Sequence, residues 1–309
     1  MNFFKPKFWD RINISPFAIL LIPISLIIKM LSLLRKSVTK TYKFSIPVIC
    51  VGNIYLGGTG KTPLCIELFS ILKSLNMDPV FIRKRYTSFQ DEVELQKQKG
   101  PVYQNKKRII AVQNAVRDGA NVVILDDGFQ DFSINKDLSI VCFNEKQWIG
   151  NGLTIPSGPL RESLSALKRA NCVIINGEKN VKIEKKILEK NSNIKIFYTK
   201  YIPKNINEFQ NKKIVAFAGI GNPENFFDLL EKNKIKTIEN IRFPDHFNYS
   251  SKMLEDLSKK TKEKDAILLT TEKDYFRISS NYKKDINYLK ILVKIQNQEK
   301  FIEEIKKII

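Results

Sequence analysis

Short apolar runs, each closed by a glycine or a polar residue, alternate with segments of helical spacing over the first two thirds of the chain. Runs of this length are typical of strands buried on both faces of a parallel sheet. The pattern predicts an α/β fold with a mostly parallel sheet and helices on both of its faces. The predicted strands are 46–52, 78–82, 108–112, 121–127, 138–143 and 171–176, with helices after residue 61 and near 113–119.

A Lys- and Asn-rich stretch at 177–193 lowers the hydrophobicity before the alternation resumes. We interpret the later part of the chain as a second, smaller α/β unit. The chain is therefore expected to divide into an N-terminal helical segment at 1–40, a P-loop domain at 41–200 and a smaller domain at 201–309. The strands expected near or within the last domain are 195–200, 213–219, 235–241, 265–270 and 288–295, with helices from about 223, from about 251 and at the C-terminus.

The segment 17–34, FAILLIPISLIIKMLSLL, is strongly apolar and near the lower length limit of a membrane span. On a helix its polar residues form one stripe, made by Ser25, Lys29, Ser32 and Lys36. We favour an amphipathic helix that lies in a membrane interface, with its apolar face among the acyl chains and its lysines toward the headgroups. Two alternatives stay open: a helix packed against the body of the protein, and a transmembrane anchor.

Composition adds a charge that needs an explanation. The 309 residues include 52 Lys and Arg against 32 Asp and Glu, a formal net charge of +20. Nucleic acid, an anionic membrane surface and an acidic substrate are candidate partners, and a compositional bias toward Lys, Ile and Asn explains the charge equally well. The basic residues show no nucleic-acid-binding signature, so we expect no nucleic-acid partner, and no obligate protein partner is evident. The single histidine excludes a site that needs two imidazoles.

The strongest local motif is the glycine-rich VGNIYLGGTGKTP at 51–63. Its glycines let backbone N–H groups point at phosphate oxygens, and the N-terminus of the next helix adds partial positive charge. Lys61 would reach the β- and γ-phosphates, and the Thr62 hydroxyl would bind Mg²⁺. The usual pattern has glycine in place of Tyr55, so a chance glycine-rich turn is the alternative. The predicted nucleotide-binding residues are Tyr55, Leu56, Gly57, Gly58, Thr59, Gly60, Lys61 and Thr62.

A second motif, VVILDDGFQ at 122–130, is an apolar strand that ends in Asp126 and Asp127. One carboxylate can orient a water on Mg²⁺ while the other contacts the metal or the nucleophile. Taken alone, the motif would be better explained as a strand-to-loop turn with solvated acids and a glycine. Beside the glycine-rich loop we interpret it as the metal-binding half of a nucleotide site.

Six motifs succeed one another along the chain: PVICVGNIYLGGTGKTP (47–63), DDGFQ (126–130), NGLTIPSGPLRE (151–162), FAGIGNPENFF (217–227), FPDHFNYS (243–250) and TTEKD (270–274). In this order they resemble the tetraacyldisaccharide 4′-kinase family of lipid A biosynthesis. The resemblance implies transfer of the ATP γ-phosphate to the 4′-hydroxyl of an acylated glucosamine disaccharide 1-phosphate, giving lipid IVA. It also implies Mg²⁺ and a peripheral or monotopic place on the cytoplasmic face of the bacterial inner membrane.

The resemblance also assigns site residues. The family's catalytic Asp and His fall on Asp91, within QDEVELQKQKGPV, and on His246 of the PDH motif. Asp91 would accept the proton of the sugar hydroxyl and His246 would orient or tune it. Arg161 is expected to contact the phosphates as a catalytic residue together with Lys61. Two further residues are placed in the site, Glu162 in the metal shell and Gln130 beside it.

Several positions depart from the family's usual motifs. RKRYTS at 83–88 replaces SRGYG, and we expect its positive charge to meet substrate phosphate or headgroups. Asp131, Phe132 and Phe247 replace a His, an Arg and a second His. TTEKD is expected to line or support the nucleotide end of the site, with a helix N-cap at Thr270 or Thr271 as the alternative.

One alternative function remains open, a membrane-associated P-loop switch ATPase of the positioning or partitioning type. Such proteins usually carry Lys where this chain has Leu56. They also offer no reason for the FPDH and GPLRE motifs.

Overall fold

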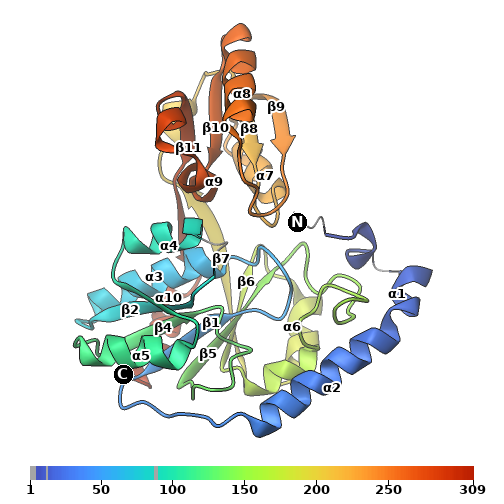
Figure 1. The fold of residues 1–309 in the computed structure, drawn as a ribbon, viewed down its shortest axis with the longest axis vertical. Helices are drawn as coiled ribbons and strands as arrows, with labels where there is room; N and C mark the ends of the chain where they lie inside the picture. The colour runs from blue at the N-terminus through green and yellow to red at the C-terminus, as the bar shows by residue number, and fades with distance from the viewer. Residues whose placement is uncertain (1–4, 12, 87–89) are drawn as a thin grey trace. The chain divides into compact units, whose positions relative to one another are not determined.

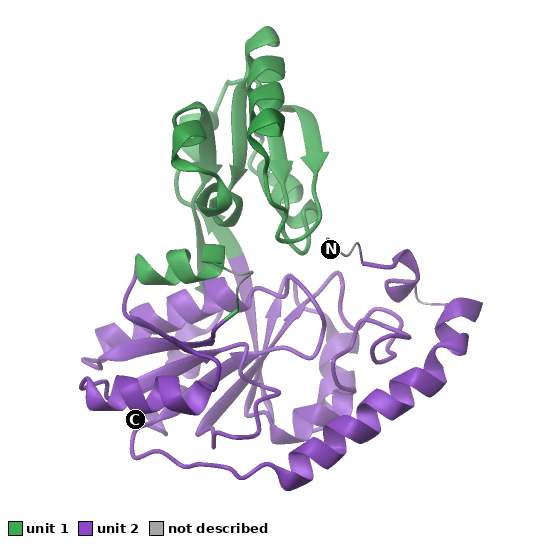
Figure 2. Cartoon of the chain, in the orientation of Figure 1, with its two compact units in different colours: residues 1–4, 86–98, 201–294 green, residues 5–85, 99–200, 295–309 purple. Residues whose placement is uncertain are grey.

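The computed structural model describes residues 5–11, 13–86 and 90–309, and divides them into two compact units (Figure 2). Unit 1 contains residues 86, 90–98 and 201–294, and unit 2 contains 5–11, 13–85, 99–200 and 295–309. This division differs from the predicted domains, because tertiary packing draws two segments across the expected boundaries. Residues 90–98, which contain a helix at Gln90–Lys97, pack within unit 1, and residues 295–309 pack within unit 2.

The sheet of unit 2 has eight strands. Their order is β12 (Ile291–Ile295), β7 (Lys195–Pro203), β6 (Cys172–Asn176), β5 (Leu138–Asn144), β1 (Val48–Gly52), β4 (Val122–Asp126), β2 (Pro79–Lys84) and β3 (Val102–Asn105). The boundaries between the units fall inside β7 and β12. From β3 to β7 all neighbouring strands are parallel. The register pairs Val51 of β1 with Asp126 of β4, so both strands end at the same edge of the sheet.

The helices of unit 2 besides the two N-terminal ones are α3 (Lys61–Ser74), α5 (Arg108–Arg117), α6 (Val181–Leu188) and α10 (Gln298–Lys306), with 3-10 turns η1 (Lys7–Trp9) and η2 (Leu164–Arg169). Helix α5 shows that the strand predicted at 108–112 is wrong. Its buried residues, Arg108, Ala111, Val112 and Ala115, recur at helical spacing, which a five-residue apolar run does not reveal. The strand of this region is the half-buried β3.

The N-terminal apolar segment forms two helices, α1 (Pro16–Leu20) and α2 (Ile22–Val38), the long blue helix of Figure 1. Pro16 opens α1 with Ser15 as its N-cap, and Leu21 separates the two helices. Ser25, from the predicted polar stripe, is buried: its hydroxyl donates to the Thr154 carbonyl at 2.9 Å and lies 2.8 Å from the Ser157 hydroxyl. At this position the polar stripe faces the protein, whereas the headgroup contact predicted from the sequence concerns the lysines of the stripe.

Many apolar side chains of α1 and α2, in contrast to the buried Ser25, are exposed to solvent. Phe17, Leu20, Leu26, Ile27 and Met30 are each more than half exposed, and several of their apolar neighbours are similarly exposed. Burial of such side chains is normally the main gain of folding, so a run of exposed ones marks an interaction surface. None of the helices in the described part of the chain combines the length and apolar character needed to cross a bilayer.

Unit 1 is built on a four-stranded parallel sheet in the order β11 (Ile286–Leu289), β10 (Ile267–Thr271), β8 (Ile214–Ala218) and β9 (Thr237–Arg242). Its helices are α4 (Gln90–Lys97), α7 (Glu224–Lys232), α8 (Ser251–Glu263) and α9 (Glu272–Arg277), with 3-10 turns η3 (Ile206–Phe209) and η4 (Ser280–Asp285). Alternate residues of β8 face two cores, one with α7 and one with α8. The α/β class with mostly parallel sheets is therefore confirmed.

The strand predicted at 288–295 is wrong in one respect. The segment contains two strands, β11 and β12, which belong to different sheets and are separated by Lys290. Apolar residues continue through both strands, so the pattern gives no sign of the break.

Candidate active site

The glycine-rich loop lies in unit 2 between β1 and α3. Gly57 and Gly60 have φ of 112° and 89°, in the left-handed region that favours glycine. The amide of Asn53 donates to the carbonyls of Tyr55 and Gly57 and to the Thr59 hydroxyl, at 2.5, 3.2 and 3.1 Å. These bonds hold the loop in a curve whose end is the N-terminus of α3, the arrangement that binds phosphate groups in nucleotide sites.

Tyr55 is fully buried, and its hydroxyl donates to the Asp10 carboxylate at 2.8 Å. Only its backbone is therefore part of the loop surface, although it was predicted among the nucleotide-binding residues. The neighbouring Leu56 donates its N–H to the Pro159 carbonyl at 2.8 Å, and Arg161 donates its own to the Ile54 carbonyl at 2.7 Å. These two backbone hydrogen bonds hold the GPLRE motif alongside the glycine-rich loop, and they explain why Arg161 lies close to that loop.

At the edge of the sheet the predicted metal and phosphate residues of unit 2 come together. The Thr62 hydroxyl donates to Asp126 at 3.3 Å, and Lys61 Nζ lies 3.7 Å from Asp127. Arg161 donates to Asp127 at 2.8 Å and to the Gln130 side chain at 3.4 Å. Hydroxyl and carboxylate oxygens are the ligands that Mg²⁺ prefers, and it usually takes only one or two carboxylates beside phosphate.

Two arginines and a lysine set the charge of this edge. Burial alone would raise the pKa of Asp127, but Lys61, Arg161 and Arg108 outweigh it and lower that pKa to about 2. Arg108 also donates to the Asp127 carbonyl at 2.7 Å and pairs with Asp131 at 3.2 Å. Asp131, one of the departures from the family, thereby helps to hold Arg108 under the end of β4.

Arg83 has a different place from the one expected. It is buried and forms an ion pair with Asp126 within unit 2, so the contact with substrate predicted for this motif would fall to Lys84 and Arg85. Thr87 and Ser88 of the same motif lie outside the described residues.

Glu162 is paired with Arg169 at 2.5 Å, and the Gln130 amide donates to the Asn53 carbonyl at 2.9 Å. Within residues 5–11, 13–86 and 90–309, no group of three or more His, Cys, Asp or Glu side chains is arranged as a metal site.

The predicted catalytic pair lies in unit 1. Asp91 is buried at the start of α4, and its Oδ2 is 3.5 Å from Nδ1 of His246. The same oxygen accepts a hydrogen bond from Arg277 at 2.8 Å. Burial works to raise the pKa of Asp91, but His246, Lys273 and Arg277 lower it to about 2. His246 itself has a φ of 55°, a strained backbone fixed by a bond from its N–H to the Gly219 carbonyl at 3.1 Å.

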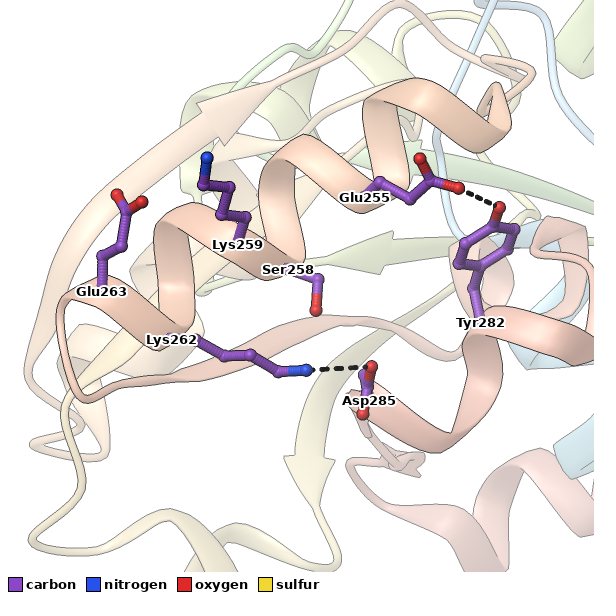
Figure 3. Close-up of a pocket in the computed structure, with 7 residues that line it drawn as sticks. All are labelled: Glu255, Ser258, Lys259, Lys262, Glu263, Tyr282 and Asp285. Carbon is purple, nitrogen blue, oxygen red and sulfur yellow. Dashed lines mark hydrogen bonds and ion pairs between the residues drawn. The ribbon is translucent and has the colours of Figure 1, made fainter.

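A separate hollow of about 490 Å³ lies between α8 and η4 (Figure 3). Its walls are mostly charged, with Glu255 bonded to Tyr282 at 2.7 Å and Lys262 to Asp285 at 3.5 Å. None of the predicted site residues lines it.

Comparison with known proteins identifies the family to which this geometry belongs. The family model for tetraacyldisaccharide-1-P 4′-kinase matches residues 17–99 and 84–309. A tetraacyldisaccharide 4′-kinase of Pelagibacter ubique (strain HTCC1062) is 42% identical over 311 residues, covering 100% of this chain and 99% of the relative. The chain belongs to the tetraacyldisaccharide 4′-kinase family.

Other members of the family agree. One from Rickettsia akari (strain Hartford) is 34% identical over 321 residues, covering 98% of this chain and 96% of the relative. The solved "apo" form of LpxK from Aquifex aeolicus in complex with ATP has a TM-score of 0.72 and 25% identity, over 94% of this chain and 99% of that one. The chain is thus an ATP-dependent kinase of this family, and the alternative of a switch ATPase is not retained.

Sequence reasoning missed two residues that this member of the tetraacyldisaccharide 4′-kinase family places beside the pair. Lys273 lies 2.8 Å from Glu92 and 3.2 Å from His246 Nε2, and Arg277 holds Asp91. Lys273 belongs to TTEKD, which was expected to serve the nucleotide end of the site. Thr271 is the N-cap of α9 and accepts from the Asp274 N–H at 3.1 Å, in agreement with the N-cap alternative.

Proposed function

We propose that this chain transfers the γ-phosphate of ATP to the 4′-hydroxyl of an acylated glucosamine disaccharide 1-phosphate. The observation that carries the proposal is the loop of unit 2, where Lys61 and Thr62 open α3 beside Asp126 and Asp127. Phosphoryl transfer asks the protein mainly for positioning and charge neutralisation. Lys61 and Arg161 would supply that charge at the phosphates.

Mg²⁺ fits the oxygen ligands of this edge. Thr62 and Asp126 would hold the ion, with Asp127 and Glu162 as further candidates from the resemblance. When bound, Mg²⁺ neutralises charge on the β- and γ-phosphates. The contribution of the chain itself is to keep the hydroxyl of Thr62 and the carboxylate of Asp126 on one side of the loop.

Asp91 and His246 would act on the acceptor hydroxyl. A carboxyl group whose pKa is about 2 stays ionised at physiological pH, so Asp91 carries no proton of its own and would accept a hydrogen bond from the sugar hydroxyl. It is a weak base, which suits a reaction in which bond formation to phosphorus is slight in the transition state and the attacking hydroxyl gives up its proton late. His246 would keep the carboxylate in place.

The apolar face of α1 and α2 would bring the enzyme to its substrate at an anionic membrane surface, on the cytoplasmic face of the bacterial inner membrane. Each buried CH₂ of an acyl chain is worth about 0.8 kcal/mol, so a multiply acylated sugar stays in the bilayer and the enzyme has to bind there. The exposed side chains of α2, such as Ile27 and Leu31, are suited to that interface.

The transfer reaction is tested with the purified chain, ATP, Mg²⁺ and the acylated disaccharide 1-phosphate in detergent. We expect a bisphosphorylated product by mass spectrometry, and none with Lys61→Ala. ATP hydrolysis without transfer to the sugar would contradict the proposal. For the membrane, Ile27→Glu should reduce co-sedimentation with anionic vesicles and leave transfer in detergent intact. Ile110→Glu, at an exposed apolar position on α5, is the matched control.

A further inference from the structure

One lysine stands at the centre of the charges around the Asp91–His246 pair in unit 1. Lys273 Nζ lies 2.8 Å from Glu92, 3.8 Å from Asp245 and 3.9 Å from Asp91. Burial alone would lower the pKa of Lys273, but these three carboxylates raise it above its ordinary value. The side chain is therefore an ammonium group, with hydrogen-bond donors and no acceptor.

The same ammonium group lies 3.2 Å from Nε2 of His246. Because an ammonium group only donates, a hydrogen bond between the two requires Nε2 to be the acceptor. A neutral imidazole that accepts at Nε2 carries its proton on Nδ1. That nitrogen faces Asp91, whose Oδ2 is 3.5 Å away.

We infer that Lys273 is a positioning residue, which holds His246 in the neutral tautomer with the proton on Nδ1 and so keeps that proton directed at Asp91. The tautomer of a histidine is set by the hydrogen bonds that its two ring nitrogens make, so the partner of Nε2 decides where the proton lies. Lys273 acts through His246, and its effect on turnover rests on the function proposed above.

Removal of the ammonium group has a definite consequence. Without Lys273, Nε2 still has the Asp245 carboxylate 3.7 Å away, and a carboxylate only accepts hydrogen bonds. A proton on Nε2 then becomes favourable. The Lys273→Met variant should therefore carry a proton on Nε2, whereas Lys273→Arg, which keeps a cation without acceptors, should not.

The chain contains a single histidine, which makes this directly measurable. In the full-length protein labelled with ¹⁵N-histidine, long-range ¹H–¹⁵N spectra report which ring nitrogen bears a proton. We expect an unprotonated Nε2 in the wild type and in Lys273→Arg, and a protonated Nε2 in Lys273→Met. Lys262→Met is the matched control, since Lys262 also pairs with a carboxylate of unit 1 but lies on α8 beside Asp285. Its spectrum should equal that of the wild type.

Turnover provides the second measurement. Lys273→Met should lower kcat about 10²-fold, the usual cost of misplacing a reacting group by about 1 Å, with little change in the KM for ATP. Lys273→Arg should restore part of the loss.

A proton on Nε2 in the wild type would overturn the inference, and so would an unchanged spectrum in a folded Lys273→Met variant. If that variant does not fold, the wild-type spectrum still decides. Absence of kinase activity in the wild type as well as in every variant, with the expected tautomers present, would instead contradict the proposed function.

Discussion

The two units each hold a buried or half-buried carboxylate with a pKa of about 2, but the cations that lower the pKa are of different kinds. Asp127 in unit 2 is held by Lys61 and Arg161, whose side chains keep 15% and 25% of their exposure. Asp91 in unit 1 lies near His246 and Lys273, but its closest cation is Arg277, which is 8% exposed and also bonded to the Gly219 carbonyl.

This difference indicates different tasks. The partners of Asp127 come from a loop-bound motif and from the first turn of α3, so they can turn from the carboxylate to a phosphate without breaking the fold. Asp91 accepts a hydrogen bond from Arg277 of α9, which also donates to the Gly219 carbonyl. Arg277 therefore cannot leave Asp91 without a large loss of stability. We therefore expect Lys61 and Arg161 to turn toward a bound phosphate, and Arg277 to stay on Asp91 and fix the geometry of the Asp91–His246 pair.

The comparison predicts the largest loss of activity when Lys61, a cation that can turn from Asp127 to a phosphate, is removed. Lys61→Ala should lower kcat by about 10³–10⁵-fold, the range of a charge that stabilises transfer of a phosphoryl group. The fold should be retained, since Asp127 keeps Arg161. Lys73→Ala, at the exposed far end of α3, is the matched control. A kinase assay with both variants checks the prediction, and equal activities would remove Lys61 from the mechanism.

A smaller loss is expected in unit 1. Asp91→Ala and His246→Ala should each lower kcat by about 10²–10⁴-fold if they act on the hydroxyl proton. Since the two side chains work as a unit, the double variant should be little worse than the worse single one. Steady-state kinetics of the three variants tests this. Additive losses would show that the residues act independently.

Much of this arrangement is visible in the sequence, and the limits have physical causes. The glycine-rich loop and the end of β4 were predicted correctly as elements because short-range spacing defines both. The contacts of Arg277 and Lys273 with Asp91 could not be predicted, because they join residues far apart in the chain through the packing of α4 on α9. The burial of Ser25 could not be predicted for a similar reason, because its partners, Thr154 and Ser157, are distant in the chain.

Acid should lower the stability that the ionised Asp91 and Asp127 contribute, by a comparable and moderate amount for each. The pKa of Asp91 falls from an ordinary 3.8 in the unfolded chain to about 2 in the folded one. The ionised Asp91 therefore adds about 2 kcal/mol to the free energy of unfolding. This stabilisation is complete above the pKa of the unfolded chain and is lost as the pH falls through the pKa of the folded chain. Melting temperatures by calorimetry from neutral pH down to the folded pKa should therefore fall less steeply for Asp91→Asn than for the wild type. Parallel curves would contradict the lowered pKa.

The smallest change in stability is expected for an exposed arginine–carboxylate pair of unit 1. Arg242 contacts Glu224 through two bonds of 2.6 and 3.1 Å, but both side chains are more than half exposed. Water already screens these charges, so such pairs contribute about 0.2–1 kcal/mol even with good geometry. Arg242→Ala should lower the free energy of unfolding within that range, and Arg277→Ala should cost several times more because it takes the closest cation away from the buried Asp91 and Asp274. Chemical denaturation of the two variants measures the contrast. If both lost equally little, burial would not be what separates the cations of unit 1 from ordinary surface charges, and the positioning role of its arginine would lose its physical basis.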